Sequence, residues 1–223
     1  KLAALEAMWH TEPAPAGIAL FGVPSLKGRE TLYEVKIPYV LGIISTRSFT
    51  GEVSGIFDLV AKAQGRIENG IAAYDAVEKL KVDRTDMAAR EQFERTKLDL
   101  GYAMLLKRYV ADPRQATPAQ IEQAAWSTVP NVPVMFWVFR GMAALGFFFI
   151  AFFGAAFYMA SIRRFGCENG FCRTFMRVAV WIIPLPWIAA EFGWILAEIG
   201  RQPWAIDGVL PTFLGASSLT VPQ

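Results

Sequence analysis

Two glutamates, Glu191 and Glu198, lie within the hydrophobic stretch that runs from Trp187 to Trp204. A carboxylate in the hydrocarbon of a membrane costs several kcal/mol unless a partner compensates for it, so such residues are candidates for function. The two acids are seven residues apart, which places them on one face of a helix, about two turns apart. We expect this face to look at a partner, a cofactor or water rather than at lipid.

An arginine and a methionine, Arg140 and Met142, interrupt an earlier hydrophobic stretch. At about 1.5 Å per residue, they lie roughly 10 Å and roughly 13 Å into that span. Counted back from the outer end of the later stretch, Glu198 lies within roughly 3 Å and Glu191 at roughly 13 Å. If both stretches cross the membrane, the four side chains fall in the same leaflet.

Two interpretations of these four side chains stay open at this point. In the first, Arg140 forms a buried ion pair with one of the glutamates and only locks two helices together. In the second, the arginine meets the acidic propionates of a haem, and Met142 supplies a thioether sulfur, which is a recognised axial haem ligand. A methionine in a span is usually a packing residue, so Met142 alone does not decide between them.

The two hydrophobic stretches predict two membrane spans. The first is expected over residues 132–162, and its segment 141–160 has 20 uncharged residues in succession, enough to cross a bilayer. The second is expected over residues 178–199 and should be broken by Pro184 and Pro186, because prolines in a span free backbone carbonyls and permit a bend.

The segment between the spans, residues 163–177, is rich in arginine, which predicts a cytoplasmic loop. Its four arginines are Arg163, Arg164, Arg173 and Arg177. The same loop contains Cys167 and Cys172, spaced as C-x4-C. A metal clip or a disulfide is one interpretation, and two reduced cytosolic thiols are the favoured one, since two ligands do not complete a zinc site.

The first half of the chain is polar. The chain has 223 residues, 54% of them hydrophobic, and a mean hydropathy of +0.32. Residues 1–110 hold 15 of the 22 basic and 14 of the 20 acidic residues, so a polar region precedes the membrane region and should lie outside the cytoplasm. The net charge of +2 gives no argument for nucleic-acid binding.

Hydrophobic periodicity and turn residues predict a mostly helical polar half with one small β-hairpin. An amphipathic helix is expected over residues 1–12, with Glu6 and the only histidine, His10, on one face four residues apart. His10 is more plausibly solvated than a ligand. The other expected elements are a hairpin of residues 17–24 and 32–38, helices at 55–81 and 86–109, and a helix at 117–126 that opens with a capping box.

Several motifs together resemble subunit I of the bacterial cytochrome bd quinol oxidases, over essentially the whole chain. The most specific are FWVFRGM at Phe136–Met142 and AEIGRQPW at Ala197–Trp204. The others are KLAALE at Lys1–Glu6, the TEPAPA run followed by LFGVP, IPYVLGIISTRS at Ile37–Ser48, LGYAMLLKRY at Leu100–Tyr109 and IPLPWIAAEFGW at Ile183–Trp194. The resemblance implies an all-α membrane protein in which two transmembrane helices follow a mostly helical extracytoplasmic quinol-binding loop.

The resemblance implies roles for the residues that match the family motifs. Lys1 and Glu6 match positions linked to quinol binding and oxidation. Met142 matches the axial ligand of a low-spin b haem, and Glu198 matches the carboxylate ligand of a high-spin b haem. The remaining matches are Arg140 beside the methionine, Trp194 between haems, the cap residues Arg201, Gln202 and Trp204, and Glu191, for which we expect a proton or charge-balancing role.

As a whole, the resemblance implies a terminal oxidase of the bacterial cytoplasmic membrane. Quinol would be oxidised at the outer face, electrons would pass through two b haems to haem d, and O2 would become water, which generates a proton gradient. Subunit II and small accessory subunits are the implied partners, together with quinol, O2 and the lipid bilayer. The implied regions are a quinol loop at 1–130, haem-site helices at 131–204 and an outer segment at 205–223 that leads to a further span.

The family's histidine haem ligands belong to a region that is not matched here. The sequence begins within a helical pattern, with no initiator methionine or signal peptide, so we expect a C-terminal part of a longer subunit. A rival hypothesis is a two-span membrane anchor that displays an extracytoplasmic binding domain and uses Arg140 and a glutamate as a structural lock. A transporter that couples protons through Glu191 and Glu198 is a weaker third hypothesis.

Overall fold

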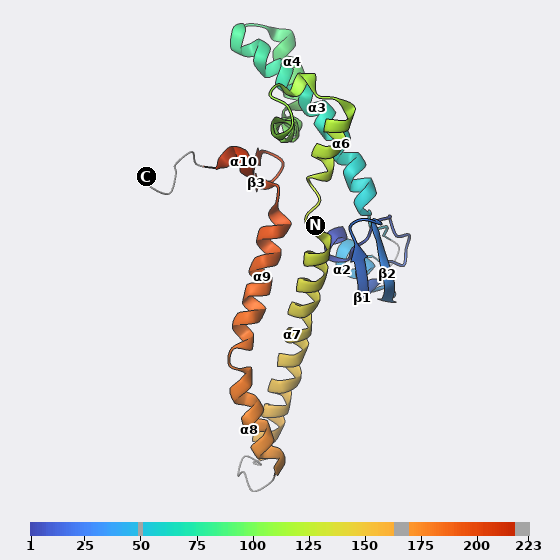
Figure 1. Ribbon diagram of the computed structural model, residues 1–223, viewed down its shortest axis with the longest axis vertical. Helices are drawn as coiled ribbons and strands as arrows, with labels where there is room; N and C mark the ends of the chain where they lie inside the picture. Colours follow the sequence, from blue (N-terminus) through green and yellow to red (C-terminus); the bar gives the residue numbers. More distant parts are fainter. Residues whose placement is uncertain (49–50, 163–169, 217–223) are drawn as a thin grey trace, which may run out of the picture.

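The computed structural model describes residues 1–48, 51–162 and 170–216. Two long helical segments run side by side, and a helical head and a small β-hairpin lie at one end of them (Figure 1). The predicted arginines Arg163 and Arg164, the predicted Cys167 and the last residues of the 205–223 segment lie outside the described residues. Cys172 lies in helix α8 and is buried.

The first predicted span is confirmed as one helix, α7 (Val132–Ser161), which begins with an Asn131 side-chain cap. The second hydrophobic segment forms two helices, α8 (Gly170–Ile182) and α9 (Leu185–Arg201), separated at Ile183 and Pro184. The predicted break is therefore confirmed, because proline cannot donate the backbone hydrogen bond that would continue the helix. The predicted start at residue 178 is wrong, since helix begins at Gly170 and includes Arg173 and Arg177.

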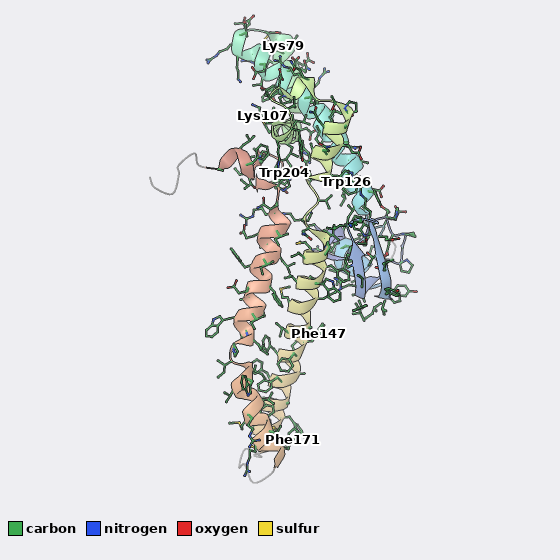
Figure 2. The ribbon with its side chains drawn as sticks, in the orientation of Figure 1. Lys79, Lys107, Trp126, Phe147, Phe171 and Trp204 are labelled. Atoms are coloured by element: carbon green, nitrogen blue, oxygen red, sulfur yellow. The ribbon has the colours of Figure 1, made fainter. Side chains whose placement is uncertain are left out.

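Both segments are apolar and long enough to cross a membrane, at Val132–Ser161 and Gly170–Arg201. Most of their side chains face outward, as the labelled Phe147 and Phe171 do in Figure 2. These two phenylalanines are 73% and 71% exposed. Such exposed apolar side chains are expected on a surface that meets lipid or another membrane segment.

Glycines set the antiparallel packing of α7 against α9. A Cβ on Gly141 would lie 2.8 Å from the Phe192 ring, and one on Gly200 would lie 3.0 Å from the Met135 methyl. The absence of side chains at these positions leaves room for the Phe192 ring and the Met135 side chain of the facing helix. Gly193 faces Met142 in the same register.

The N-terminal region contains α1 (Leu2–Leu5), the strands β1 (Ile18–Ser25) and β2 (Glu30–Ile37), and α2 (Val40–Thr46). The predicted hairpin is confirmed, with Ser25 paired to Glu30 and Ile18 to Ile37. The predicted helix over residues 1–12 is wrong, because α1 ends at Leu5 and Ala7 has a φ of 50°. A positive φ lies outside the right-handed helical region, so Glu6 leaves the helix instead of sharing a face with His10.

The helical head is built on α3 (Ile56–Val82), which confirms the predicted helix over 55–81. The predicted continuous helix over 86–109 is instead divided into α4 (Met87–Thr96), η1 (Lys97–Asp99), α5 (Leu100–Met104) and η2 (Leu105–Arg108). Arg66 of α3 explains the division, because its Nε donates to Asp99 Oδ1 at 2.6 Å and holds the chain at that turn.

Two short helical elements lead from the head to the first span. They are η3 (Pro113–Gln115) and α6 (Pro118–Trp126). The predicted capping box of α6 is confirmed, since the Thr117 hydroxyl accepts from the Gln120 N–H and the Gln120 side chain accepts from the Thr117 N–H. Beyond α9, β3 (Trp204–Ile206), β4 (Leu210–Pro211) and α10 (Thr212–Gly215) return the chain toward the head.

One hydrophobic core joins the head, the N-terminal region and the top of α7. Its large, fully buried members include Leu41, Ile56, Ile67, Leu105, Leu106 and Phe136. Because this core continues into the first turns of α7, it fixes the position of Arg140, one turn after Phe136.

Candidate functional site

Arg140 binds the N-terminal region, not the neighbouring span. Its Nη2 donates to the Glu6 carboxylate at 3.0 Å and to the backbone oxygen of Ala19, and its Nη1 donates to the backbone oxygen of Leu5 at 2.8 Å. The Arg140 side chain is 12% exposed and the Glu6 side chain 2%. The Ala19 N–H also donates to Glu6, at 3.0 Å. The two charges are therefore enclosed and share their partners.

The structure corrects the interpretation in which Arg140 pairs with a glutamate of the second span. The Glu198 carboxylate lies 3.8 Å from Arg201, one turn along its own helix, and Glu191 is exposed. Arg140 does form a buried ion pair, but its partner is Glu6, 134 residues away in sequence. The predicted pairing of Glu6 with His10 is also wrong, since His10 packs against the Phe57 ring at 4.9 Å.

Glu6 is a carboxyl group whose proton affinity is increased by its surroundings. Burial raises its pKa above the ordinary value of 4.5, and this effect outweighs the opposing effects of the Arg140 charge and the Ala19 hydrogen bond. A group in this state is better able to take up a proton near neutral pH than an exposed glutamate is.

Met142 lies at the contact between the spans. Its Sδ would be 3.6 Å from a Cβ at Gly193, so the thioether lies over the glycine of α9. Glu198 is five residues beyond Gly193, which places it about 7.5 Å nearer the C-terminal end of α9 at 1.5 Å per residue. The Glu198 side chain is 42% exposed, and its distance to Arg201 is too long for a hydrogen bond.

The donor chemistry of these two residues fits haem iron. A thioether is an axial ligand of low-spin haem, and a carboxylate with lone pairs not used in hydrogen bonds can bind iron. The Arg140 Nε is buried without a partner among the described residues, but Arg140 faces the N-terminal region whereas Met142 faces α9. The described residues contain no cluster of three or more His, Cys, Asp and Glu that would suit a separate metal ion.

Of the other predicted residues, some are buried or hydrogen-bonded at the end of α9 and others are exposed. Trp204 is buried and packs against the Tyr102 ring at 4.9 Å, whereas Trp194 is 63% exposed on α9. Gln202 accepts from the Thr212 hydroxyl at 3.1 Å, which fixes the turn after α9. Arg201 is exposed. Thus the GRQPW motif forms a turn at the C-terminal end of α9, held by the Thr212–Gln202 hydrogen bond.

Lys1 lines a cavity, whereas Glu6 is enclosed by protein. Lys1 lines a cavity of about 550 Å³ between the head and the end of α9, together with Gln202 and Trp204. Glu6 instead lies against Arg140. The structure therefore groups Lys1 with the GRQPW turn and Glu6 with the arginine of the first span, a division that the motif KLAALE did not predict.

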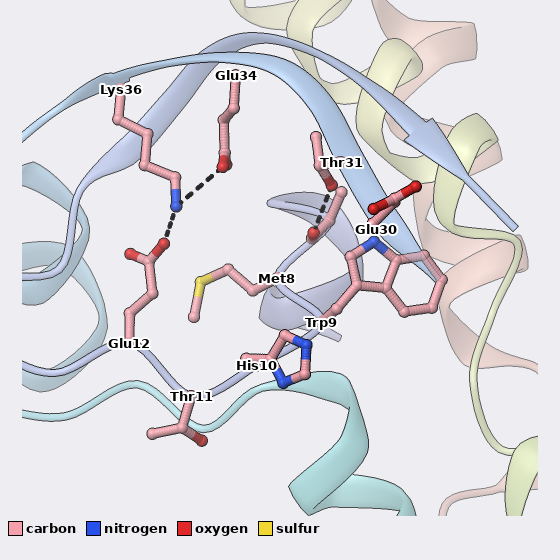
Figure 3. Close-up of a pocket in the computed structure, with 10 residues that line it drawn as sticks. Met8, Trp9, His10, Thr11, Glu12, Glu30, Thr31, Glu34 and Lys36 are labelled. Atoms are coloured by element: carbon pink, nitrogen blue, oxygen red, sulfur yellow. Dashed lines mark hydrogen bonds and ion pairs between the residues drawn. The ribbon is translucent and has the colours of Figure 1, made fainter. Parts of the chain in front are cut away.

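A second cavity, of about 360 Å³, lies beside the backbone that follows Glu6 (Figure 3). Figure 3 shows the Lys36 ammonium between the carboxylates of Glu12 and Glu34, with Met8, Trp9 and His10 nearby. The sequence offered no signal for this cluster beyond alternating charges on a predicted strand, because Glu12 reaches it from a separate segment.

The chain matches one family model over residues 1–223, that of cytochrome bd terminal oxidase subunit I. The chain belongs to this family. It is 35% identical, over all 223 of its residues, to cytochrome bd-II ubiquinol oxidase subunit 1 of Escherichia coli (strain K12). It is 24% identical over 212 residues, or 95% of the chain, to cytochrome bd ubiquinol oxidase subunit 1 of Bacillus subtilis (strain 168).

The match covers only part of each relative. The chain spans 43% of the Escherichia coli subunit and 32% of the Bacillus subtilis subunit. The resemblance to cytochrome bd subunit I that the motifs predicted is thereby confirmed at the level of the family. The individual roles of Met142, Glu198 and the other site residues stay predictions.

Proposed function

We propose that this chain forms part of the quinol-oxidising subunit of a terminal oxidase, a quinol:O2 oxidoreductase. The relatives are named ubiquinol oxidase subunits, which supports quinol as the substrate class. The observation that carries the proposal is the buried ion pair between Glu6 and Arg140. It joins a carboxyl group of the quinol-loop region to the span, two residues from the thioether of Met142.

Met142 would hold a low-spin b haem and Glu198 a high-spin b haem, with a haem d elsewhere in the complete enzyme. Haems bound in this way supply one-electron transfer and O2 chemistry that side chains lack. Gly193 leaves room for the Met142 thioether to occupy a fixed place between the spans. Arg201, Gln202 and Trp204 lie at the C-terminal end of α9, where Arg201 has donors for propionates, and Trp194 is exposed seven residues earlier on the same helix.

Glu6 is the group we propose to take a proton from quinol. Its raised pKa suits a general base that works near neutral pH, and Arg140 stabilises the carboxylate when the proton is absent. Arg140 also holds the Leu5 and Ala19 backbone, so the base keeps its position. Lys1, in the neighbouring cavity, is proposed to bind a quinol oxygen.

The proposed setting is the bacterial cytoplasmic membrane. Residues 1–130 would lie on the outer side and residues 163–177 in the cytoplasm, in agreement with the arginines of that loop. Release of quinol protons outside and uptake of protons for O2 reduction inside would separate charge without a pump. Subunit II and small accessory subunits are the proposed partners. Glu191, exposed on the same helix as Glu198, is proposed to balance charge or move protons.

Membranes that contain the complete subunit and its partners test this proposal. We expect quinol-dependent O2 uptake together with b and d haem bands in the reduced-minus-oxidised spectrum. Membranes that contain the full complex but show neither the bands nor the uptake would contradict the proposal. The rival two-span anchor predicts that outcome, since it needs Arg140 and Glu6 only as a structural lock.

A further inference from the structure

The proposed proton acceptor has no direct path to water. The Glu6 side chain is 2% exposed, and its described partners are Arg140 and the Ala19 N–H. Quinol oxidation releases two protons, so each proton taken by Glu6 must move on before the next turnover. If Glu6 takes the proton, as the proposed function has it, other residues must carry the proton away.

The pairing of the hairpin places two ionisable residues next to Glu6. Ala19, whose N–H and C=O hold Glu6 and Arg140, is directly paired with Lys36 on β2. A Cβ on Gly22 would lie 3.4 Å from the Phe136 ring and 3.8 Å from the Glu34 Cα. Glu34 and Lys36 of strand β2 therefore lie close to the turn of α7 that carries Arg140.

Glu34 and Lys36 connect this region to an open cavity. The Lys36 Nζ lies 3.1 Å from the Glu34 carboxylate and also forms an ion pair with Glu12. The three side chains are 24%, 31% and 22% exposed, in the order Glu34, Lys36 and Glu12. All three line the cavity of about 360 Å³, which has room for several waters at about 30 Å³ each.

The charges in this region couple Glu34 to Glu6. Burial raises the pKa of Glu34, the positive charge of Arg140 lowers it, and the negative charge of Glu6 raises it. Lys36 in turn has its pKa lowered by burial and raised by the charge of Glu6. The proton affinity of Glu34 therefore rises when Glu6 has lost its proton, so the charge states of the two carboxyl groups are coupled.

We propose that Glu34 receives the proton that Glu6 takes from quinol, and that Lys36 and Glu12 pass it through the cavity to extracytoplasmic water. Only O–H and N–H bonds change in this sequence: the Lys36 ammonium gives a proton to Glu12 as it takes one from Glu34, and Glu12 then releases its proton to cavity water. The quinol O–H breaks as the Glu6 O–H forms, and the Glu6 O–H breaks as Glu34, directly or through a cavity water, gains the proton. The two electrons of quinol leave separately, to the b-type haem acceptor of the proposed function.

The test compares Glu34→Gln with Glu34→Asp and with Glu91→Gln in the complete oxidase. Glu91 is an exposed acid of α4 that is also paired with a basic residue, Arg95, so it is a matched control far from the site. We expect Glu34→Gln to lower quinol turnover about tenfold with KM unchanged, less than the roughly 10²–10⁴-fold effect of a direct proton-transfer group, because cavity water partly replaces the side chain. We expect Glu34→Asp to restore most of the rate.

Two further readouts separate proton transfer from structure. In Glu34→Gln the solvent deuterium isotope effect on turnover should increase, and a protonated-carboxyl band should disappear from the reduced-minus-oxidised infrared difference spectrum. The haem bands should stay unchanged. Normal turnover and an unchanged isotope effect in Glu34→Gln would overturn the relay while the wild-type activity still supports the proposed function. A wild-type complex without quinol-dependent O2 uptake would overturn both.

Discussion

Glu6 and Glu198 are both carboxyl groups near the same end of the helix pair α7 and α9, yet their surroundings are opposite. The Glu6 side chain is 2% exposed and bound to a guanidinium group and a backbone N–H. The Glu198 side chain is 42% exposed, and its carboxylate lies 3.8 Å from Arg201, which is too far for a hydrogen bond. Burial and pairing suit Glu6 to accept a proton. The oxygen lone pairs of Glu198 are free to bind a metal ion such as haem iron. We therefore propose that the same residue type serves two kinds of chemistry in this chain.

The largest expected effect comes from removing the partner of the enclosed acid. Arg140→Met should lower the free energy of unfolding by about 3–5 kcal/mol, because a buried charge pair that loses one member leaves the other uncompensated. Thermal unfolding of the purified complex measures this. Arg201→Met is the matched control and should change stability by at most about 1 kcal/mol, since its ion pair is half-exposed and screened by solvent. Equal losses in the two variants would remove the contrast between the sites.

The next effect concerns activity rather than stability. Glu6→Ala should lower quinol oxidation about a hundredfold, the lower end of the range for general-base residues, and should leave the haem content intact. Turnover at saturating quinol, together with the reduced-minus-oxidised spectrum, measures both. Unchanged turnover at saturating quinol would exclude Glu6 from the reaction.

A smaller effect should appear as a pH dependence. Because the folded-state pKa of Glu6 is raised above 4.5, folding favours its protonated form. The corresponding stability is present below pH 4.5 and is lost as the pH rises through the raised pKa. In Glu6→Gln this fall should disappear, as measured by thermal unfolding from acid to neutral pH. The acid limb of the wild-type turnover profile should likewise lie above pH 4.5. A profile that is flat from pH 4.5 to neutral would contradict the assignment of Glu6 as the base.

The elements that were predicted correctly depend on local signals. The turn between β1 and β2, the period of α3, the capping box at Thr117 and the unbroken apolar run of α7 each need only a few neighbouring residues to be recognised. The predicted break at Pro184 has a similarly local cause.

The predictions that failed depend on contacts between distant segments. The end of α1 at Leu5 follows from the binding of Glu6 to Arg140, and the interruption at Asp99 follows from Arg66 on another helix. Neither contact leaves a periodic pattern in the sequence. The cluster of Glu12, Glu34 and Lys36 was missed for the same reason. Glu198 was singled out because an acid is rare in an apolar span, and Met142 because a thioether can bind haem iron; their assignment to particular haems came from the family resemblance and stays a prediction.

The central claim is that Met142 binds haem iron, and Met142→Leu in the complete oxidase tests it most directly. This substitution conserves side-chain volume, so the unfolding free energy should change by less than about 1.5 kcal/mol. The reduced-minus-oxidised spectrum should nevertheless lose its low-spin b band or shift it to a high-spin form. A variant with the wild-type low-spin band and wild-type stability would show that the sulfur only packs against Gly193, and would contradict the account.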